Sequence, residues 1–503
     1  MDLATGIRAA LATIRRRPAD LLPMYLLTLA APVIARVFTF AGLVLVLAYL
    51  TVTDRIDLFF TELEAIEMTP PDPEGEPEAF LEWLESFEPA VEALVTPTTL
   101  GILFFSIGIT IAVGIVIAAA IEAGQLAACY GRLRREPGLI NGIGGVRNYW
   151  LSLLGLYVME LVLWITVTGF AVIVLAAAAA VSLALAVILA IFVVLFWLAA
   201  IAAIRAIFVF APVSVVVDEQ SALGSLRQSA GFIRNELMAA AGYYAISLGI
   251  LFGLASASAA AAPFGGAGLM SLAGILLVTP GLHLLKTALY GDYRDSISPY
   301  TDVETRFREQ VRNGTGRAFR ELGSFIPATP VAHVASAGFL VVGFFAGWLL
   351  IEPLDGVVEM SIRARTETII PPVTALQIFG NNWAVALSAA FSGVAFAIPA
   401  IVTLLHNGVM FGAVSRLETE LDVLAAFVIP HGILEIPAIV VAGAVGIHLG
   451  IAVWRAWRGQ MSRNTLAATF ERAFWVLIAL GFVLALAAAI EGFVSPYYWR
   501  LFL

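Results

Sequence analysis

This sequence of 503 residues has very little charge, a single cysteine and a single lysine. Charged residues make up only 13% of the chain and hydrophobic residues 60%, whereas about a quarter of a soluble globular domain is charged. The lone Cys129 excludes an internal disulfide and a cluster of thiolate metal ligands. These shortages exclude the ordinary soluble and the disulfide-rich secreted classes, and the composition predicts a polytopic membrane protein.

Long apolar segments fill most of the chain. The run 165–201 is continuously apolar rather than alternating, which excludes the strands of a membrane barrel. One helical crossing of a bilayer needs about 20 residues. We therefore predict an all-α fold, an integral membrane protein with about 11 transmembrane helices. Amphipathic helices at the membrane surface are expected over 3–17 and 221–237.

Residues 1–298 are predicted to form an N-terminal domain of six spans. Its segment 54–98 carries 13 acidic residues and one arginine, a net charge of −12, so the rest of the chain is weakly positive at about +3. The arginines of 15–17 and 132–135 flank apolar runs and indicate the cytoplasmic side. The N-terminus is thus expected in the cytoplasm and the acidic loop outside. That loop is either a solvated, salt-adapted segment or a surface that attracts cations or a basic partner.

Residues 299–503 are predicted to form a second membrane domain of five spans. The loop after 351 is expected outside and the arginine-rich loop 454–472 inside, so an odd number of crossings must join them. The segment 379–454 is too long for one span, which leaves three crossings or one crossing with a re-entrant hairpin. The last span, 473–490, then places the C-terminus outside a plasma membrane.

Polar residues in this apolar second half predict an intramembrane cluster, because a titratable group in hydrocarbon is costly and by default functional. His431 and Glu435 are four residues apart and share one helix face. The members of the predicted cluster are Asn381, Asn382, His406, Asn407, His431, Glu435 and Glu491. Three readings stay open: a purely structural hydrogen-bonded cluster, a metal or proton site that uses His431, Glu435, His406 and also Glu491, or the lining of a substrate or ion pathway.

Proline and glycine predict how the helices of this region end and pack. Pro399, Pro430 and Pro437 are expected to break helices, with a new helix starting at Pro430 and a kink at Pro437. Small residues let helix backbones approach closely in a membrane. The expected packing positions are Gly393, Gly408, Gly412, Gly443, Gly446 and Gly450.

A set of motifs in the second half resembles the stage II sporulation protein M family. The motifs are Asn381-Asn382, the span around Gly393, His406-Asn407-Gly408 with Gly412, Pro430-His431-Gly432 with Glu435 and Pro437-Ala438, Ala442-Gly443, and Glu491-Gly492-Phe493-Val494-Ser495-Pro496. The resemblance covers about 299–503 and implies a membrane domain of about five spans. In spore formers the family belongs to the engulfment machinery and holds peptidoglycan-degrading partners at the septal membrane. The six-span first half and its acidic loop depart from the family.

These observations favour a non-enzymatic membrane scaffold of an envelope or membrane-remodelling complex. The alternatives are a transporter or channel for ions or lipids and, ranked lower, an intramembrane metal-dependent enzyme. The sequence contains no nucleotide, thiol or triad motif, so we predict no cofactor, no catalytic residue and no assigned metal ligand. The expected partners are the lipid bilayer and proteins of a membrane complex, with a homo-oligomer left open and no nucleic acid.

Overall fold

The computed structural model describes residues 2–66, 69–72, 75–300, 306–354, 356, 358–367, 369–498 and 500. Over these residues the chain is 87% helical and forms no strand. The predicted all-α class is confirmed, and the protein is a polytopic membrane protein. Part of the acidic loop, residues 67–68 and 73–74, lies outside the described residues.

The first half of the chain consists of long apolar helices separated by shorter polar ones. Its long helices are α2 (Leu22–Val52), α6 (Pro97–Leu133), α7 (Gly138–Val181), α8 (Leu183–Phe208), α11 (Leu237–Ala261) and α13 (Thr279–Tyr293), the last continuing from α12 (Ala267–Ala273) through the π-helical turn η3 (Gly274–Val278). The shorter elements are α1 (Leu3–Arg16), η1 (Pro18–Asp20), α3 (Arg55–Glu64), α4 (Pro77–Glu85), α5 (Glu88–Leu94), α9 (Ala211–Val217), α10 (Ala222–Asn235) and η2 (Ala262–Phe264).

The second half begins with an arginine-bearing amphipathic helix and continues with five long helices. These are α14 (Phe307–Ala328), followed by α15 (Pro330–Leu350), α17 (Pro371–Ser392), α18 (Ile398–Leu417), α19 (Leu421–Trp457) and α20 (Arg463–Phe493). The minor elements are η4 (Glu352–Leu354), α16 (Ile362–Glu367) and α21 (Ser495–Tyr498).

Ten helical segments of the described chain are long and apolar enough to cross a membrane. Two other helices of 22 residues, the amphipathic α14 and the predicted crossing α17, are not among them. Helix α17 packs against α2, α19 and α20, so much of its surface faces protein rather than lipid. A helix enclosed in this way needs less apolar surface than one that faces lipid, and its polar residues are the ones singled out from the sequence.

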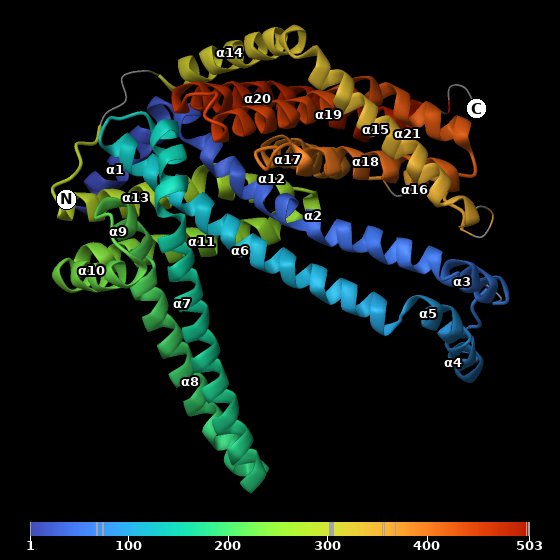
Figure 1. Cartoon of the computed structure of the whole chain (residues 1–503), viewed down its shortest axis with the longest axis horizontal. Coiled ribbons are helices and arrows are strands. Elements are labelled where there is room, and N and C mark those ends of the chain that lie inside the picture. Colours follow the sequence, from blue (N-terminus) through green and yellow to red (C-terminus); the bar gives the residue numbers. More distant parts are fainter. Residues whose placement is uncertain are drawn as a thin grey trace.

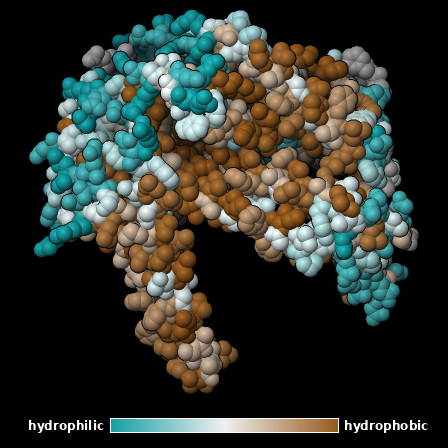
Figure 2. Space-filling view, in the orientation of Figure 1, coloured by the Kyte–Doolittle hydropathy of each residue, from teal (hydrophilic) through white to brown (hydrophobic). Residues whose placement is uncertain are grey.

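Two pairs of helices extend from the main body (Figure 1). The pair α2 and α6 leads to the acidic helices α3, α4 and α5, while α7 and α8 form a separate hairpin whose far end touches no other part of the molecule in the view. The surface of this hairpin is hydrophobic along its length (Figure 2). At 44 residues, α7 is about 66 Å long, which exceeds the hydrocarbon thickness of a bilayer.

A single large hydrophobic core joins the two halves of the chain. It includes Tyr25 and Tyr290 from the first half together with Phe391 and Leu477 from the second. The proposed boundary at 298/299 therefore does not coincide with a gap between two cores. It remains a prediction based on sequence.

Glycines in the second half let the backbones of neighbouring helices come into direct contact. A methyl group added at Gly408 or Gly412 would collide with backbone atoms of α15, and one added at Gly343 or Gly347 with the backbone of α18. The other expected packing positions also lie against neighbouring helices: Gly393 against Gly446, Gly450 against Ala397, and Gly443 against Ser336 and Leu404. Such contacts leave these helices little freedom to move apart.

The proline positions differ in part from the sequence prediction. Pro399 is the second residue of α18 and follows the turn 393–397, where Phe396 and Ala397 adopt positive φ angles of 58° and 66°. At Pro430 and Pro437, however, α19 continues without interruption. The predicted helix start at Pro430 is wrong, because the helix begins at Leu421. The helix packs against α17 and α20, and in membranes neighbouring helices commonly stabilise the backbone groups that a proline leaves without a donor.

Candidate functional site

Six of the seven polar residues expected to form a cluster lie around one region of the second half. Asn381 and Asn382 come from α17, Asn407 from α18, His431 and Glu435 from α19, and Glu491 from α20. The seventh, His406, is exposed and contributes to neither the cavity nor the group of donor atoms described below. A helix turns by about 100° per residue, so its neighbour Asn407 faces the cluster while His406 faces away.

A chain of amides holds the Glu435 carboxylate. Asn381 donates a hydrogen bond of 3.2 Å to the side-chain oxygen of Asn382, and Asn382 donates one of 2.9 Å to Oε1 of Glu435. Asn381 and Asn382 both belong to α17, whereas Glu435 belongs to α19. The bond therefore ties two membrane helices together with neutral donors and leaves Oε2 of Glu435 available for another partner.

His431 is positioned by a hydroxyl and directed toward a second carboxylate. Its Nδ1 lies 2.9 Å from Oγ of Ser495, and its Nε2 lies 4.0 Å from Oε2 of Glu491. The histidine is only 5% exposed. One ligand atom each from His431, Glu435 and Glu491 can be chosen so that all three lie within 4.8 Å of one another. One nitrogen and two carboxylate oxygens at this spacing could hold a metal ion or share protons.

A cavity of about 200 Å³ adjoins this group. Its polar lining consists of Asn381, Asn382, Thr403, Asn407 and Glu435, and the remaining lining is apolar. Asn407 donates a hydrogen bond of 2.8 Å to the carbonyl of Thr403, within its own helix. Since a water molecule occupies about 30 Å³ in the liquid, the space is large enough for a few waters or a small hydrated ion.

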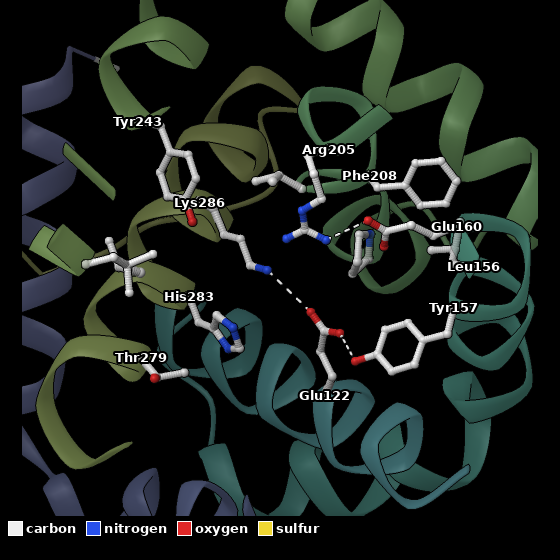
Figure 3. A pocket seen from close by; sticks show the side chains of 14 residues that line it. Glu122, Leu156, Tyr157, Glu160, Arg205, Phe208, Tyr243, Thr279, His283 and Lys286 are labelled. Atoms are coloured by element: carbon white, nitrogen blue, oxygen red, sulfur yellow. Dashed lines mark hydrogen bonds and ion pairs between the residues drawn. The ribbon is translucent and has the colours of Figure 1, made fainter. Parts of the chain in front are cut away.

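A second, larger cavity of about 400 Å³ lies in the first half (Figure 3). Two ion pairs cross it: Nζ of Lys286 lies 3.4 Å from Glu122, and Nη1 of Arg205 lies 2.7 Å from Glu160. Tyr157 also donates a hydrogen bond to the Glu122 carboxylate. Each carboxylate thus has a cation from this chain beside it, and the four charges cancel.

A buried Tyr25, Cys129 and His283 adjoin this charged cavity. The Tyr25 hydroxyl lies 3.1 Å from Sγ of Cys129 and 3.2 Å from Nδ1 of His283. His283 lines the cavity next to Lys286 (Figure 3). The hydroxyl therefore connects α2, α6 and α13 through polar contacts inside the apolar core.

The sequence analysis did not identify the charged cavity, although signals for it were present. Lys286 is the only lysine of the chain, and Glu122 is the only charged residue between 98 and 131. A lone ionisable residue in an apolar span is itself evidence of a site. Its partner could not be identified, because Glu122 and Lys286 are 164 positions apart in the sequence.

Comparison with known families finds a match for the part of the chain that holds one site but not for the part that holds the other. Residues 336–496 match the family model described as Stage II sporulation protein M, whereas the N-terminal half matches no family model. No curated protein and no solved structure matches the chain. The resemblance noted over about 299–503 is thus supported within its central part. The amide, histidine and carboxylate cluster lies inside the matched residues, and the charged cavity lies outside them.

Proposed function

We propose that this protein is a non-enzymatic membrane scaffold of an envelope or membrane-remodelling complex. The similarity of residues 336–496 to Stage II sporulation protein M supports this assignment. That family is not known as an enzyme family. The proposal gives the second half the role of a rigid membrane core and the first half that of a surface for partner helices.

The observation that carries this proposal is the contrast in burial between the membrane helices. In the most apolar window of each span, 61% of residues are buried for α19 and 56% for α20. The corresponding values are 0% for the α8 and α11 spans and 11% for α6 and α7. Helices with so much free apolar surface must contact lipid or the helices of other proteins. A scaffold needs such surfaces, whereas a closed transport pathway needs helices packed around a channel.

The proposed partners are the lipid bilayer and membrane-spanning proteins, with a homo-oligomer also open and no nucleic acid expected. We place the protein in the plasma membrane with a cytoplasmic N-terminus. The arginine-bearing α1 and α14 support that orientation, and the acidic helices α3–α5 are suited to the outer side. With α17 counted as an eleventh crossing, the C-terminus lies outside.

Site-specific photocrosslinking in intact membranes tests the scaffold. A photoreactive amino acid replaces Phe192 on α8, a side chain that is 65% exposed, and a control replaces the buried Val445 on α19. We expect the Phe192 position to yield one protein adduct of fixed mass in stoichiometric amount, and the control to yield none. Crosslinking of Phe192 to lipid alone, repeated along the α7–α8 hairpin, would contradict the scaffold.

Transport of ions or lipids is a second candidate, favoured by the two polar cavities among membrane helices. Reconstituted vesicles would show flux that Glu435→Gln and His431→Ala both reduce. Absence of flux for a panel of ions and lipids in the wild type would remove this candidate.

A further inference from the structure

The donor group formed by His431, Glu435 and Glu491 has a composition that the rest of the cluster does not explain. Hydrogen bonding between the helices requires only the amides, and Asn382 already supplies it to Glu435. The carboxylates of Glu435 and Glu491 have oxygens within 4.8 Å of each other, so they repel each other when both are ionised. A cation between them would remove that repulsion and attract both.

The most buried donor of the group is His431, and its second ring nitrogen is directed toward a carboxylate. His431 is 95% buried, and Ser495 occupies its Nδ1. Its Nε2 lies 4.0 Å from Oε2 of Glu491, which is beyond hydrogen-bonding distance. In a neutral histidine whose Nδ1 is hydrogen-bonded, the other ring nitrogen is the one that binds a metal ion.

His431 and Glu435 each form a hydrogen bond through the side-chain atom that would not bind the metal ion. Protein metal ligands typically bond through their second atom to an outer partner, which fixes their orientation. Ser495 plays that part for His431, and Asn382 plays it for Glu435. Both outer partners are neutral, so neither competes with a cation for the charge of the site.

The spacing of the donors is close to that of a coordinated ion. Oxygen and nitrogen donors about 2.1 Å from a tetrahedral ion lie about 3.4 Å from each other. The three atoms found within 4.8 Å would therefore close on an ion after small movements of the two glutamate side chains. The cavity of about 200 Å³ lined by Glu435 gives room for the water molecules that would complete the coordination.

We propose that His431, Glu435 and Glu491 bind one divalent first-row transition-metal ion between α19 and α20. An imidazole nitrogen beside two carboxylates selects such ions over Mg²⁺ and Ca²⁺, which prefer oxygen ligands alone. Three protein ligands leave a coordination position open toward the cavity. The ion joins α19 to α20, and because Glu435 is bonded to Asn382 it also secures α17. This proposal does not depend on the scaffold function.

Metal binding by the full-length protein in detergent micelles provides the test. After treatment with a chelator, the protein is dialysed against Zn²⁺, with Mn²⁺ and Mg²⁺ in parallel, and bound metal is measured by elemental mass spectrometry. We expect about one Zn²⁺ per chain, and at least a tenfold loss of affinity in Glu435→Gln and in Glu491→Gln. Ser495→Ala should weaken binding by about tenfold while leaving the three ligands in place.

The acidic helices of the first half supply the matched control. Glu64 on α3 and Glu82 on α4 are exposed. The double variant Glu64→Gln/Glu82→Gln removes two negative charges, one more than either ligand variant. It should bind Zn²⁺ as the wild type does. A wild type that binds no Zn²⁺, or equal binding by the wild type and both ligand variants, would overturn the proposal.

Thermal unfolding distinguishes loss of the ion from loss of the fold. Zn²⁺ should raise the Tm of the wild type and of the acidic-helix control, because a ligand of the native state stabilises it. Zn²⁺ should not raise the Tm of Glu435→Gln or Glu491→Gln. This holds also for a variant whose Tm without metal equals that of the wild type. A His431→Gln variant stabilised by Zn²⁺ as strongly as the wild type would also overturn the proposal.

Discussion

The two polar sites of this protein neutralise their carboxylates in opposite ways. In the charged cavity of the first half, Glu122 and Glu160 face Lys286 and Arg205, so the chain supplies both signs. In the cluster of the second half, Glu435 is held by the neutral amide of Asn382, and the described residues that line its cavity include no lysine or arginine. A site with its own counter-ions is complete. A carboxylate held by a neutral amide is suited to a cation from outside.

The two sites also differ in how the helices around them are packed. The second site lies among helices locked by glycine contacts, where donor atoms keep a fixed spacing. The first site lies where α7 and α8, whose most apolar windows are little buried, meet the body (Figures 1 and 3). The first site thus joins its helices by ion pairs between side chains of this chain, whereas the second joins α17 to α19 through a neutral amide and a carboxylate.

The largest expected effect comes from breaking the ion pair of the first site. Lys286 and Glu122 have side chains only 7% and 16% exposed, so Lys286→Met leaves a carboxylate buried with Tyr157 as its remaining donor. Such a loss typically costs about 3–5 kcal/mol. The double variant Lys286→Met/Glu122→Gln removes both charges and should recover most of that stability. Reversible unfolding in mixed micelles measures all three proteins, and a cost below about 1 kcal/mol for the single variant would refute the pairing.

A smaller but still large effect is expected from the glycine contacts of the second half. Gly412→Val would push side-chain carbon into the backbone of Phe344, which cannot move aside as a flexible side chain could. Overpacking of this kind costs about 1–3 kcal/mol or more. Gly169→Val on α7 is the matched control, because a Cβ there would meet no atom of another helix within 4 Å. Equal unfolding free energies for the two variants would show that the two halves do not differ in packing.

The amide chain should have a moderate effect. Asn382→Leu removes the donor to Glu435 and leaves that carboxylate oxygen without its partner, at a cost of about 1–3 kcal/mol. Asn381→Leu removes only the bond to Asn382, a neutral contact at an exposed residue, and should cost about 1 kcal/mol or less. Denaturant titration of both variants checks this order, which would be reversed if Asn382 did not hold the carboxylate.

The grouping of polar residues in the second half was predictable from the sequence, whereas the charged cavity of the first half was not, and the reason is physical. His431 and Glu435 fall on one helix face by periodicity alone, and the count of crossings brings α17, α18 and α19 together. Exclusion of His406 required the rotation of α18, which the pattern does not determine. The continuity of α19 through Pro430 required knowledge of its packing, because a neighbouring helix can replace a missing hydrogen bond. The charged cavity depends on contacts between distant helices, for which no local pattern exists.

The smallest effect is expected at the surface, outside both sites, where Asp2 caps α1. The hydroxyl and backbone amide of Thr5 interact with its carboxylate, the amide at 2.7 Å, and lower the pKa of Asp2 below its ordinary value. A lowered pKa means that the cap contributes stability above the unfolded-state pKa and loses it as pH falls through the folded-state pKa. Hydrogen exchange of the first turn of α1 should therefore accelerate on acidification. Asp2→Asn caps a helix equally well without titrating, so its exchange should lack that additional acceleration. The same acceleration in Asp2→Asn would assign the effect to another group.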